Sequence, residues 1–340
     1  MNNIIEEDII EIKKYINFEK LFNKKILLTG GTGLIGTYLI STLISLNDVE
    51  NANIKIYLVI HNELPKHLEK IKNRNDINIY KGDLSEYEFC YNLPECDFII
   101  HAAGYAQPNK FLSQKVKTIM INTMCTSILL NKLKENGNML FISTSEIYSG
   151  ANNLPYTEKT CGLTMPDHPR ASYIEGKRCG EAICFAFSEM TSKNVKIARV
   201  SLAYGPGVKK DDSRVLYNFI QKGLKGRIEL VDFGEDIRVY CYVRDTVIML
   251  YNILLNGKSK VYNVGGNSYI QIKHLAKLIG SYLHADVILP KNINNKLVGA
   301  PKSVYVSCES YIKEFGEFNY IPIEIGLKRT IEWCRNEWKE

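Results

Sequence analysis

A glycine-rich turn between an apolar strand and a helix constrains this chain more than any other feature. Residues 25–29 (KILLT) run into Gly30-Gly31-Thr32-Gly33-Leu34-Ile35-Gly36, and residues 37–43 continue as a helix. This glycine spacing permits a tight turn, close approach of the backbone to a pyrophosphate, and tight contact between helix and strand. The helix N-terminus adds N–H donors and a positive dipole. We therefore predict a dinucleotide site whose phosphate-binding residues are Gly30, Gly33, Leu34, Ile35 and Gly36.

Short apolar runs alternate with amphipathic stretches as far as residue 204. Runs that are apolar on both faces are typical of a parallel sheet covered by helices on each side, and the handedness of the crossovers makes such a sheet doubly wound. The expected fold class is α/β, a Rossmann sheet with a smaller C-terminal α/β substrate-binding lobe. The predicted strands are Ile26–Thr29, Ile54–Ile60, Ile77–Tyr80, Phe98–Ala102, Met139–Ser143 and Lys196–Val200.

The chain of 340 residues is long enough for about two domains. We expect a helical extension over residues 1–23 with a helix at Ile4–Phe22, a mainly dinucleotide-binding domain over 24–204, and a mainly nucleotide-sugar-binding lobe over 205–340. We also expect the chain to cross back between the lobes and the ligand to bind in the cleft between them. Elements predicted for the last part are Val215–Gly223, Ile228–Val231, Val239–Val243, Asp245–Leu255, Ile272–Leu283 and Ile325–Asn336.

Composition and charge exclude several classes of protein. Apolar residues make up 45% and charged residues 24%, which excludes a disordered chain, and the net charge of +6 is dispersed rather than gathered into a nucleic-acid-binding stripe. We expect no membrane partner, because no apolar run is long enough to span one. Acidic residues near the start argue against a secretory signal, so a cytoplasmic location is expected. Nine cysteines without a C-x-x-C motif indicate neither disulfides nor a metal site.

The end of the second predicted strand bears on the choice of dinucleotide. NAD-preferring folds place an acid there to bind the ribose hydroxyls, but this chain has His61 and Asn62. We favour NAD as the cofactor, with NADP left open. Asp83 and Leu84 follow the third strand, where they either lie at the adenine edge or begin the next helix.

A tyrosine and a lysine four residues apart follow a strand that ends in hydroxyl side chains. Tyr173 and Lys177 share one helix face, so we expect the ammonium to lower the pKa of the phenol from about 10 toward neutrality, giving a usable base. Thr144 ends the strand at the edge where open α/β sheets bind ligands, and its hydroxyl can orient a substrate alcohol.

Together these motifs resemble the extended short-chain dehydrogenases/reductases of the nucleotide-sugar epimerase/dehydratase group, from residue 24 to residue 333. The chain is most similar to the UDP-glucuronate decarboxylase (UDP-xylose synthase) branch, through residues 143–148 (STSEIY), 169–178 (PRASYIEGKR) and 213–220 (SRVLYNFI). The T-S-E triplet is shared with GDP-mannose 4,6-dehydratases. The resemblance implies Thr144, Tyr173 and Lys177 as the hydride-transfer triad and Glu146 as a second acid/base.

The resemblance also implies further binding residues. Asn122 matches an asparagine that helps to place the catalytic lysine, and Ala102, Ala103 and Gly104 match a loop that passes the cofactor. On the substrate side it implies that Arg238 grips the diphosphate, which suits a forked cation. A surface salt bridge is the alternative role for Arg238 and for Arg214. Ser145, Glu146, Arg214 and Asn218 complete the expected substrate site. A homodimer formed through two helices of each subunit is expected on the same ground.

Two departures from the family pattern bear on the reaction. The decarboxylases carry an arginine in an R-K-P-like segment, whereas residues 297–302 read LVGAPK, which disfavours decarboxylation. The asparagine usual before Y/F-G-P is also replaced, in residues 199–206 (RVSLAYGP). We therefore expect the hexose or its phosphate to be held differently from the pattern of the family.

The expected function is oxidation of a nucleotide sugar at C4 by an NAD(P)-dependent enzyme, as in 4-epimerases, 4,6-dehydratases and 4-dehydrogenases, in bacterial surface-polysaccharide synthesis. A carboxylate of Glu146 near C5 would permit elimination or epimerisation, and otherwise the ketone is returned as a 4-epimer or released. UDP-glucuronate decarboxylation and NADPH-dependent reduction of a 4-keto sugar are alternatives. A non-catalytic dinucleotide-sensing regulator is the alternative of another class.

Overall fold

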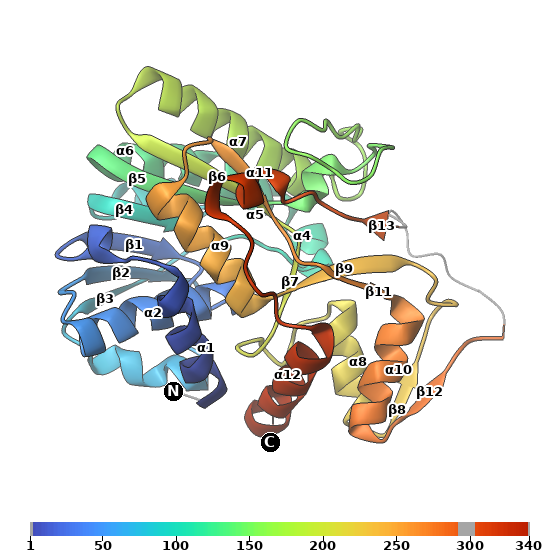
Figure 1. The fold of residues 1–340 in the computed structure, drawn as a ribbon. Helices are drawn as coiled ribbons and strands as arrows, with labels where there is room; N and C mark the ends of the chain where they lie inside the picture. The colour runs from blue at the N-terminus through green and yellow to red at the C-terminus, as the bar shows by residue number, and fades with distance from the viewer. Residues whose placement is uncertain (1–2, 292–302, 339–340) are drawn as a thin grey trace.

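The computed structural model describes residues 3–291 and 303–338, and its centre is a seven-stranded sheet (Figure 1). The strand order is β10-β6-β5-β4-β1-β2-β3, and every pairing between neighbours is parallel. The order reverses beside β1, so the carboxyl ends of β1 and β4 form the switch point at which such sheets bind ligands. The strands are β1 Lys25–Thr29, β2 Lys55–Ile60, β3 Ile77–Lys81, β4 Cys96–His101, β5 Leu133–Thr144, β6 Asn194–Val200 and β10 Val261–Val264.

Successive strand residues enter two separate cores, one on each face of the sheet. Ile26 and Leu28 of β1 belong to one apolar cluster, whereas Leu27 between them belongs to the other. This period of two confirms the predicted doubly wound architecture. The first core lies under α1, α2 Leu34–Glu50 and α9 Val243–Asn256, and the second lies under α3 Tyr87–Tyr91, α5 Lys115–Asn122, α6 Met124–Lys132 and α7 Ala171–Met190 (Figure 1).

The first helix is shorter than the periodicity predicts. Helix α1 covers Asn3–Tyr15, and a short 3-10 helix η1 follows at Glu19–Leu21. The side-chain oxygen of Asn17 accepts a hydrogen bond from the backbone N–H of Glu19 (2.9 Å). Asparagine offers the backbone this local partner in place of the next helical one, which explains why the helix does not reach Phe22.

The C-terminal lobe carries two small sheets beside the large one (Figure 1). In one, β9 pairs with β7, β11 and β13; in the other, β8 pairs with β12. Helices α8 and α10 have the predicted bounds. The elements are β7 Leu202–Tyr204, α8 Val215–Gly223, β8 Arg227–Glu229, β9 Ile237–Tyr242, β11 Ser268–Gln271, α10 Ile272–Leu283, β12 Asp286–Ile288, β13 Ser303–Val304, α11 Glu309–Phe315 and α12 Ile323–Glu337.

Three short elements complete the chain: η2 Lys66–Asn73, α4 Pro108–Ser113 and η3 Ser145–Tyr148. Within residues 3–291 and 303–338, no helix has the length and apolar character needed to cross a membrane. Over the same ranges, no group of three or more His, Cys, Asp or Glu side chains is arranged to hold a metal ion.

Candidate active site

The glycine-rich turn has the close backbone contacts that its sequence predicts. Gly30 adopts a positive φ of 73°, and a Cβ there would lie 2.6 Å from the backbone of Ala102. A Cβ on Gly36 would lie 2.1 Å from the carbonyl oxygen of Gly30. Gly33 is the N-cap of α2, and a Cβ there would have nothing nearer than 3.4 Å. The turn is therefore tightly packed at Gly30 and Gly36 and open at Gly33, in front of the helix N–H groups.

The loop after β4 brings three predicted cofactor residues together. A Cβ on Gly104 would lie 3.8 Å from Nζ of Lys177 and 3.9 Å from Oδ1 of Asn122. That Asn122 oxygen is buried and accepts no hydrogen bond, while its Nδ2 donates to the carbonyl of Thr118 (2.7 Å). A cationic donor and an unused acceptor beside an open glycine fit a polyhydroxylated ribose. With the open face at Gly33, these residues fit a dinucleotide.

The predicted adenosine-side residues follow β2 and β3. His61 and Asn62 come directly after β2, and Nδ1 of His61 lies 3.3 Å from the carbonyl oxygen of Gly82. Both oxygens of Asp83 have partners within the chain, since Oδ1 accepts from Ser85 and Oδ2 from Lys117 (2.7 Å). Burial alone would raise the pKa of Asp83, but these hydrogen bonds lower it to about 2. Leu84 is buried in the core under α3 and α6.

The predicted triad comes from the end of β5 and from the first turns of α7. Thr144 is the last residue of β5, and its hydroxyl interacts with the Tyr173 phenol. Tyr173 and Lys177 are both buried on α7. Lys177 Nζ donates to the carbonyl oxygen of Ile142 (2.7 Å) and lies 4.7 Å from the centre of the Phe141 ring. The lysine is therefore fixed to the strand that carries the threonine.

The pKa of Tyr173 differs from the sequence expectation. Burial and, to a lesser extent, the charge of Glu146 raise the pKa, Thr144 and Arg170 lower it, and the net pKa is about 12. Lys177 is itself buried, which lowers its pKa to about 8. The expected shift toward neutrality assumed a solvated phenol beside a free ammonium. In the folded chain the phenol is desolvated and a carboxylate lies nearby.

Glu146 is paired with an arginine that the sequence analysis did not select. Arg170 donates from Nε to Oε2 of Glu146 (2.9 Å) and from Nη2 to Oε1. Its guanidinium lies 5.0 Å from the centre of the Phe111 ring, and that ring stacks on Tyr173 at 4.8 Å with an interplanar angle of 5°. Arg170, Phe111 and Glu146 therefore surround the phenol. Ser145, the residue before Glu146, is buried at the start of η3.

The predicted substrate-side residues lie on α8 and β9. Arg214 is the N-cap of α8, and Asn218 lies in the next turn. Arg238 is on β9. Burial raises the pKa of Tyr240, and the positive charges of Arg238 and Arg214 lower it. The positive charge of Arg214 also lowers the pKa of Tyr173, so this residue of the lobe influences the phenol. Each of these arginines is paired with an aspartate two residues earlier, Arg214 with Asp212 (2.7 Å) and Arg238 with Asp236 (3.1 Å).

A family model named "NAD dependent epimerase/dehydratase family" matches residues 26–265. This match spans the glycine turn, the triad and both arginines. The chain belongs to the NAD-dependent epimerase/dehydratase family. It is an enzyme of this extended short-chain dehydrogenase/reductase family, whose model is named for its dependence on NAD.

Relatives of this family member are named as decarboxylases. "UDP-glucuronic acid decarboxylase 1" of Xenopus tropicalis is 28% identical over 99% of this chain and 82% of the relative. "UDP-glucuronic acid decarboxylase 6" of Arabidopsis thaliana is 31% identical over 78% of this chain and 76% of the relative. The protein is therefore a member of a group of nucleotide-sugar epimerases, dehydratases and decarboxylases.

Solved structures show the same fold. A UDP-glucose 4-epimerase of Thermotoga maritima has a TM-score of 0.76 at 22% identity, covering 93% of this chain and 100% of its own. A dTDP-glucose 4,6-dehydratase of Streptomyces venezuelae, solved with NAD bound, has a TM-score of 0.79 at 20% identity, covering 93% and 99%.

Arg170 and Phe111 are the site residues that reasoning from sequence missed. Arg170 stands three residues before Tyr173, within the quoted motif of residues 169–178, so its place at the start of the catalytic helix could have drawn attention to it. Phe111 carries no comparable signal, since it is one aromatic residue in the short helix α4.

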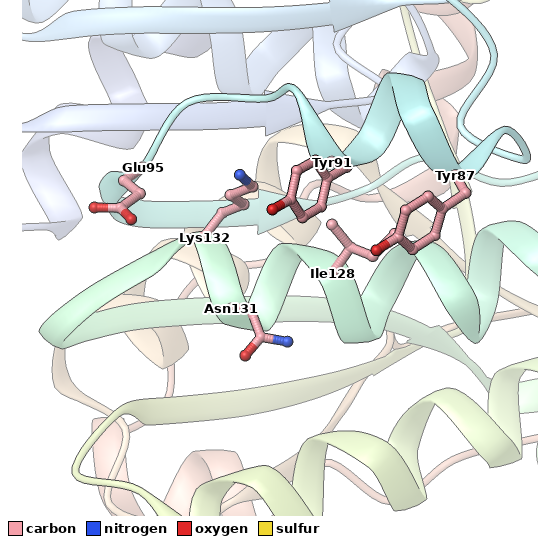
Figure 2. Close-up of a pocket in the computed structure, with 6 residues that line it drawn as sticks. All are labelled: Tyr87, Tyr91, Glu95, Ile128, Asn131 and Lys132. Carbon is pink, nitrogen blue, oxygen red and sulfur yellow. The ribbon is translucent and has the colours of Figure 1, made fainter.

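A separate surface hollow of about 190 Å³ lies between α3 and α6, away from these residues (Figure 2). Its walls include the stacked rings of Tyr87 and Tyr91, with Nζ of Lys132 4.8 Å from the Tyr91 ring centre. None of the predicted site residues lines it.

Proposed function

We propose that the protein oxidises the C4 alcohol of a nucleotide sugar, with Tyr173 as the base. The observation that carries this proposal is the position of Tyr173, beside the Thr144 hydroxyl and one helical turn from Lys177, which in turn lies against Gly104. Thr144 ends β5, Tyr173 and Lys177 lie on α7, and Lys177 reaches the loop at Gly104. Proton transfer by a positioned group contributes about 10²–10⁴-fold to such a step.

NAD, when bound, supplies the hydride acceptor for this oxidation. The chain's own residues handle the proton: Thr144 orients the C4 hydroxyl, and Tyr173 takes up its proton as the ketone forms, once positive charge beside the phenol has lowered its pKa from about 12. Lys177, held by the Ile142 carbonyl, faces the cofactor loop at Gly104 and keeps a positive charge below its pKa of about 8. The same groups run in reverse when the ketone is reduced.

The nucleotide diphosphate would bind on the lobe side of the phenol. Arg214 and Arg238 flank Tyr240, and each presents a fork suited to phosphate oxygens. The charge of Arg214 also lowers the pKa of Tyr173. A diphosphate bound to Arg214 would therefore place the sugar next to the base. Asn218 and Ser145 stay predictions as substrate contacts, as do His61, Asn62, Asp83 and Leu84 as cofactor contacts.

Decarboxylation of UDP-glucuronic acid is a second candidate, favoured by the names of the relatives. A 4-keto uronate is a β-keto acid, so the C5–C6 bond can break with its electron pair moving toward the ketone and carbon dioxide leaving. The segment whose missing arginine argued against this reaction, residues 297–302, lies outside the described residues. The oxidation at C4 is the same in both candidates.

A substrate panel tests the proposal. Purified protein with NAD is incubated with UDP-glucose, UDP-glucuronic acid, dTDP-glucose and GDP-mannose, and the products are analysed by mass. Loss of carbon dioxide identifies a decarboxylase, loss of water a dehydratase, loss of two hydrogens a dehydrogenase, and an isomer of unchanged mass an epimerase. Net consumption of NADPH with a keto sugar would favour the reductase, and binding of NAD without turnover of any sugar would favour the sensor.

Replacement of the proposed base gives the first prediction. Tyr173→Phe keeps the ring that stacks on Phe111 and removes only the hydroxyl, so the variant should fold and bind NAD while turnover falls by about 10²–10⁴-fold. NAD titration and product analysis measure the two effects. Undiminished turnover would show that another group is the base.

We further infer that the protein is a homodimer in the cytoplasm. Helices α5 and α7 pack side by side, and Val116 and Ile119 of α5 are exposed (73% and 41%). Apolar side chains on such a face are suited to a partner subunit. Size-exclusion chromatography with light scattering tests the dimer. A role in bacterial surface polysaccharides has no support from the frog, zebrafish and Arabidopsis relatives.

A further inference from the structure

The Glu146–Arg170 ion pair lies beside the phenol and is held from several sides. The arginine fork reaches both carboxylate oxygens, and the two side chains are only 13% and 27% exposed for Arg170 and Glu146. The guanidinium also lies over the ring of Phe111. The Arg170 carbonyl accepts hydrogen bonds from the N–H groups of Tyr173 and Ile174 (both 3.1 Å). Arg170 is therefore anchored to the first turn of α7 at its backbone and to Glu146 at its tip.

This arrangement reduces what the carboxylate can do as a base. A carboxylate that accepts a forked guanidinium has one lone pair of each oxygen occupied. Taking up a proton would turn Glu146 into a neutral acid and leave the partly buried guanidinium without its counter-charge, which is costly. Proton transfer to Glu146 is therefore disfavoured while the fork is closed.

The charges of the pair also reach the phenol. Glu146 raises the pKa of Tyr173 and Arg170 lowers it, so the two partly cancel at the proposed base. The carboxylate is therefore held, as half of an ion pair, next to the stacked rings of Phe111 and Tyr173.

We propose that Arg170 is a specificity-determining positioning residue: by holding both oxygens of Glu146, it withholds the carboxylate from the C5 hydrogen and steers the 4-keto sugar away from loss of water. This inference rests on the proposed C4 oxidation. Elimination needs Glu146 to take the C5 proton while the C6 hydroxide leaves, giving water overall. Return of the ketone to an alcohol needs no proton from C5, and neither does breakage of the C5–C6 bond of a uronate.

Deuterium exchange at C5 measures removal of the C5 proton separately from oxidation at C4. The NAD-loaded enzyme is incubated with UDP-glucose, and in parallel with dTDP-glucose, in heavy water. Oxidation is followed by the near-ultraviolet absorbance of the reduced nicotinamide, and recovered sugar is analysed by NMR for deuterium at C5. For the wild type we expect exchange at about one-tenth of the oxidation rate or less, which corresponds to a barrier higher by about 1.4 kcal/mol.

Variants of Arg170 should release the carboxylate. In Arg170→Gln the ratio of exchange to oxidation should rise about tenfold. Arg170→Lys, which keeps the charge but not the fork, should give a smaller rise. Glu146→Gln added to Arg170→Gln should return the ratio to the wild-type level. Arg74→Gln is the matched control, because Arg74 also forks onto a carboxylate, that of Asp48, on α2; its ratio should equal that of the wild type.

The outcomes separate this inference from the proposed function. Wild-type exchange as fast as oxidation, or a ratio that stays the same or falls in both Arg170 variants, would overturn the role of Arg170 while leaving C4 oxidation standing. Absence of reduced nicotinamide with every sugar would remove the C4 oxidation itself. Circular dichroism and NAD titration establish whether each variant folds, and if Arg170→Gln does not, the wild-type and lysine ratios decide.

Discussion

The nucleotide-binding half and the C-terminal lobe hold their functional cations in different ways. In the first, Nζ of Lys177 donates to a backbone carbonyl, that of Ile142 (2.7 Å). In the lobe, each predicted diphosphate-binding arginine is paired with an aspartate two residues earlier, Arg214 with Asp212 (2.7 Å) and Arg238 with Asp236 (3.1 Å). Lys177 is thus fixed by the main chain, whereas the two arginines of the lobe are fixed by ion pairs between side chains.

This difference fits the two kinds of ligand. A carbonyl partner neither titrates nor competes for an anion, so it is suited to a group that must keep one position beside a cofactor. A carboxylate partner neutralises an arginine while no ligand is bound, and a phosphate can then replace it, because both are bidentate acceptors of the same fork. Under the proposed function, these ion pairs suit a ligand that arrives and leaves.

The largest effect should come from a substitution that breaks the rigid side. A Cβ on Gly36 would lie 2.1 Å from the Gly30 carbonyl oxygen, so Gly36→Ala must distort the turn, at a cost of about 1–3 kcal/mol or more, and should abolish NAD binding. Gly226 in the lobe has nothing within 4 Å of a Cβ, but its φ is +88°. Gly226→Ala should therefore cost only about 1 kcal/mol of backbone strain and leave NAD binding intact.

Gly33→Ala separates binding from folding in the same turn. Gly33 has an ordinary φ of −85° and no atom closer than 3.4 Å to a Cβ, so this variant should keep wild-type stability yet weaken NAD binding by filling the space in front of α2. Urea unfolding and NAD titration measure the two quantities. Tight NAD binding by Gly33→Ala would show that the pyrophosphate does not approach there.

We expect opposite changes in UDP affinity when the two members of the Arg238–Asp236 ion pair are substituted. Arg238→Lys loses the fork, so UDP binding should weaken by about 2 kcal/mol, or roughly thirtyfold. Asp236→Asn removes the competing carboxylate, so UDP should bind more tightly, by about threefold, or roughly 0.7 kcal/mol. Isothermal titration with UDP tests both. Weaker binding in Asp236→Asn would mean that the aspartate orients the arginine rather than competing with the ligand.

Sequence periodicity predicted the sheet well, because each strand and helix carries its own apolar pattern. The glycine turn was equally readable, since the approach of Gly36 to Gly30 is a local contact within seven residues. The Glu146–Arg170 pair was not, because it joins residues 24 positions apart through a fold that the pattern does not encode. The raised pKa of Tyr173 was missed for the same reason, since burial and the Glu146 charge are tertiary properties.

The hydrogen bonds of Asp8 are another tertiary feature that the sequence pattern did not predict. Asp8 is buried and accepts hydrogen bonds from Tyr38 of α2 (2.7 Å) and Tyr242 of β9 (2.8 Å), which are far away in sequence. The acidic character of the N-terminal segment gave an argument about targeting, but one of its acids serves instead to join the first helix to both halves of the molecule.

The last prediction concerns the pH dependence of stability through His101, a buried side chain at the end of β4. Its Nδ1 lies 2.7 Å from the Thr29 hydroxyl, and its Nε2 lies 3.2 Å from the Ile121 carbonyl. Burial, with the nearby charge of Lys177, lowers its pKa from 6.5 to about 3. Below pH 6.5 the unfolded chain therefore binds a proton that the folded chain does not, and this loss of stability is absent at higher pH.

The free energy of unfolding should fall by about 1.4 kcal/mol for each pH unit lost between these two pKa values, through His101 alone. His101→Gln cannot titrate, so the difference in stability between wild type and variant should shrink by that amount per unit on acidification, while other groups cancel. Urea unfolding at several pH values measures it. A difference in stability that stays constant with pH would mean that His101 takes up a proton in the folded protein as readily as in the unfolded chain. The lowered pKa of His101 would then be wrong.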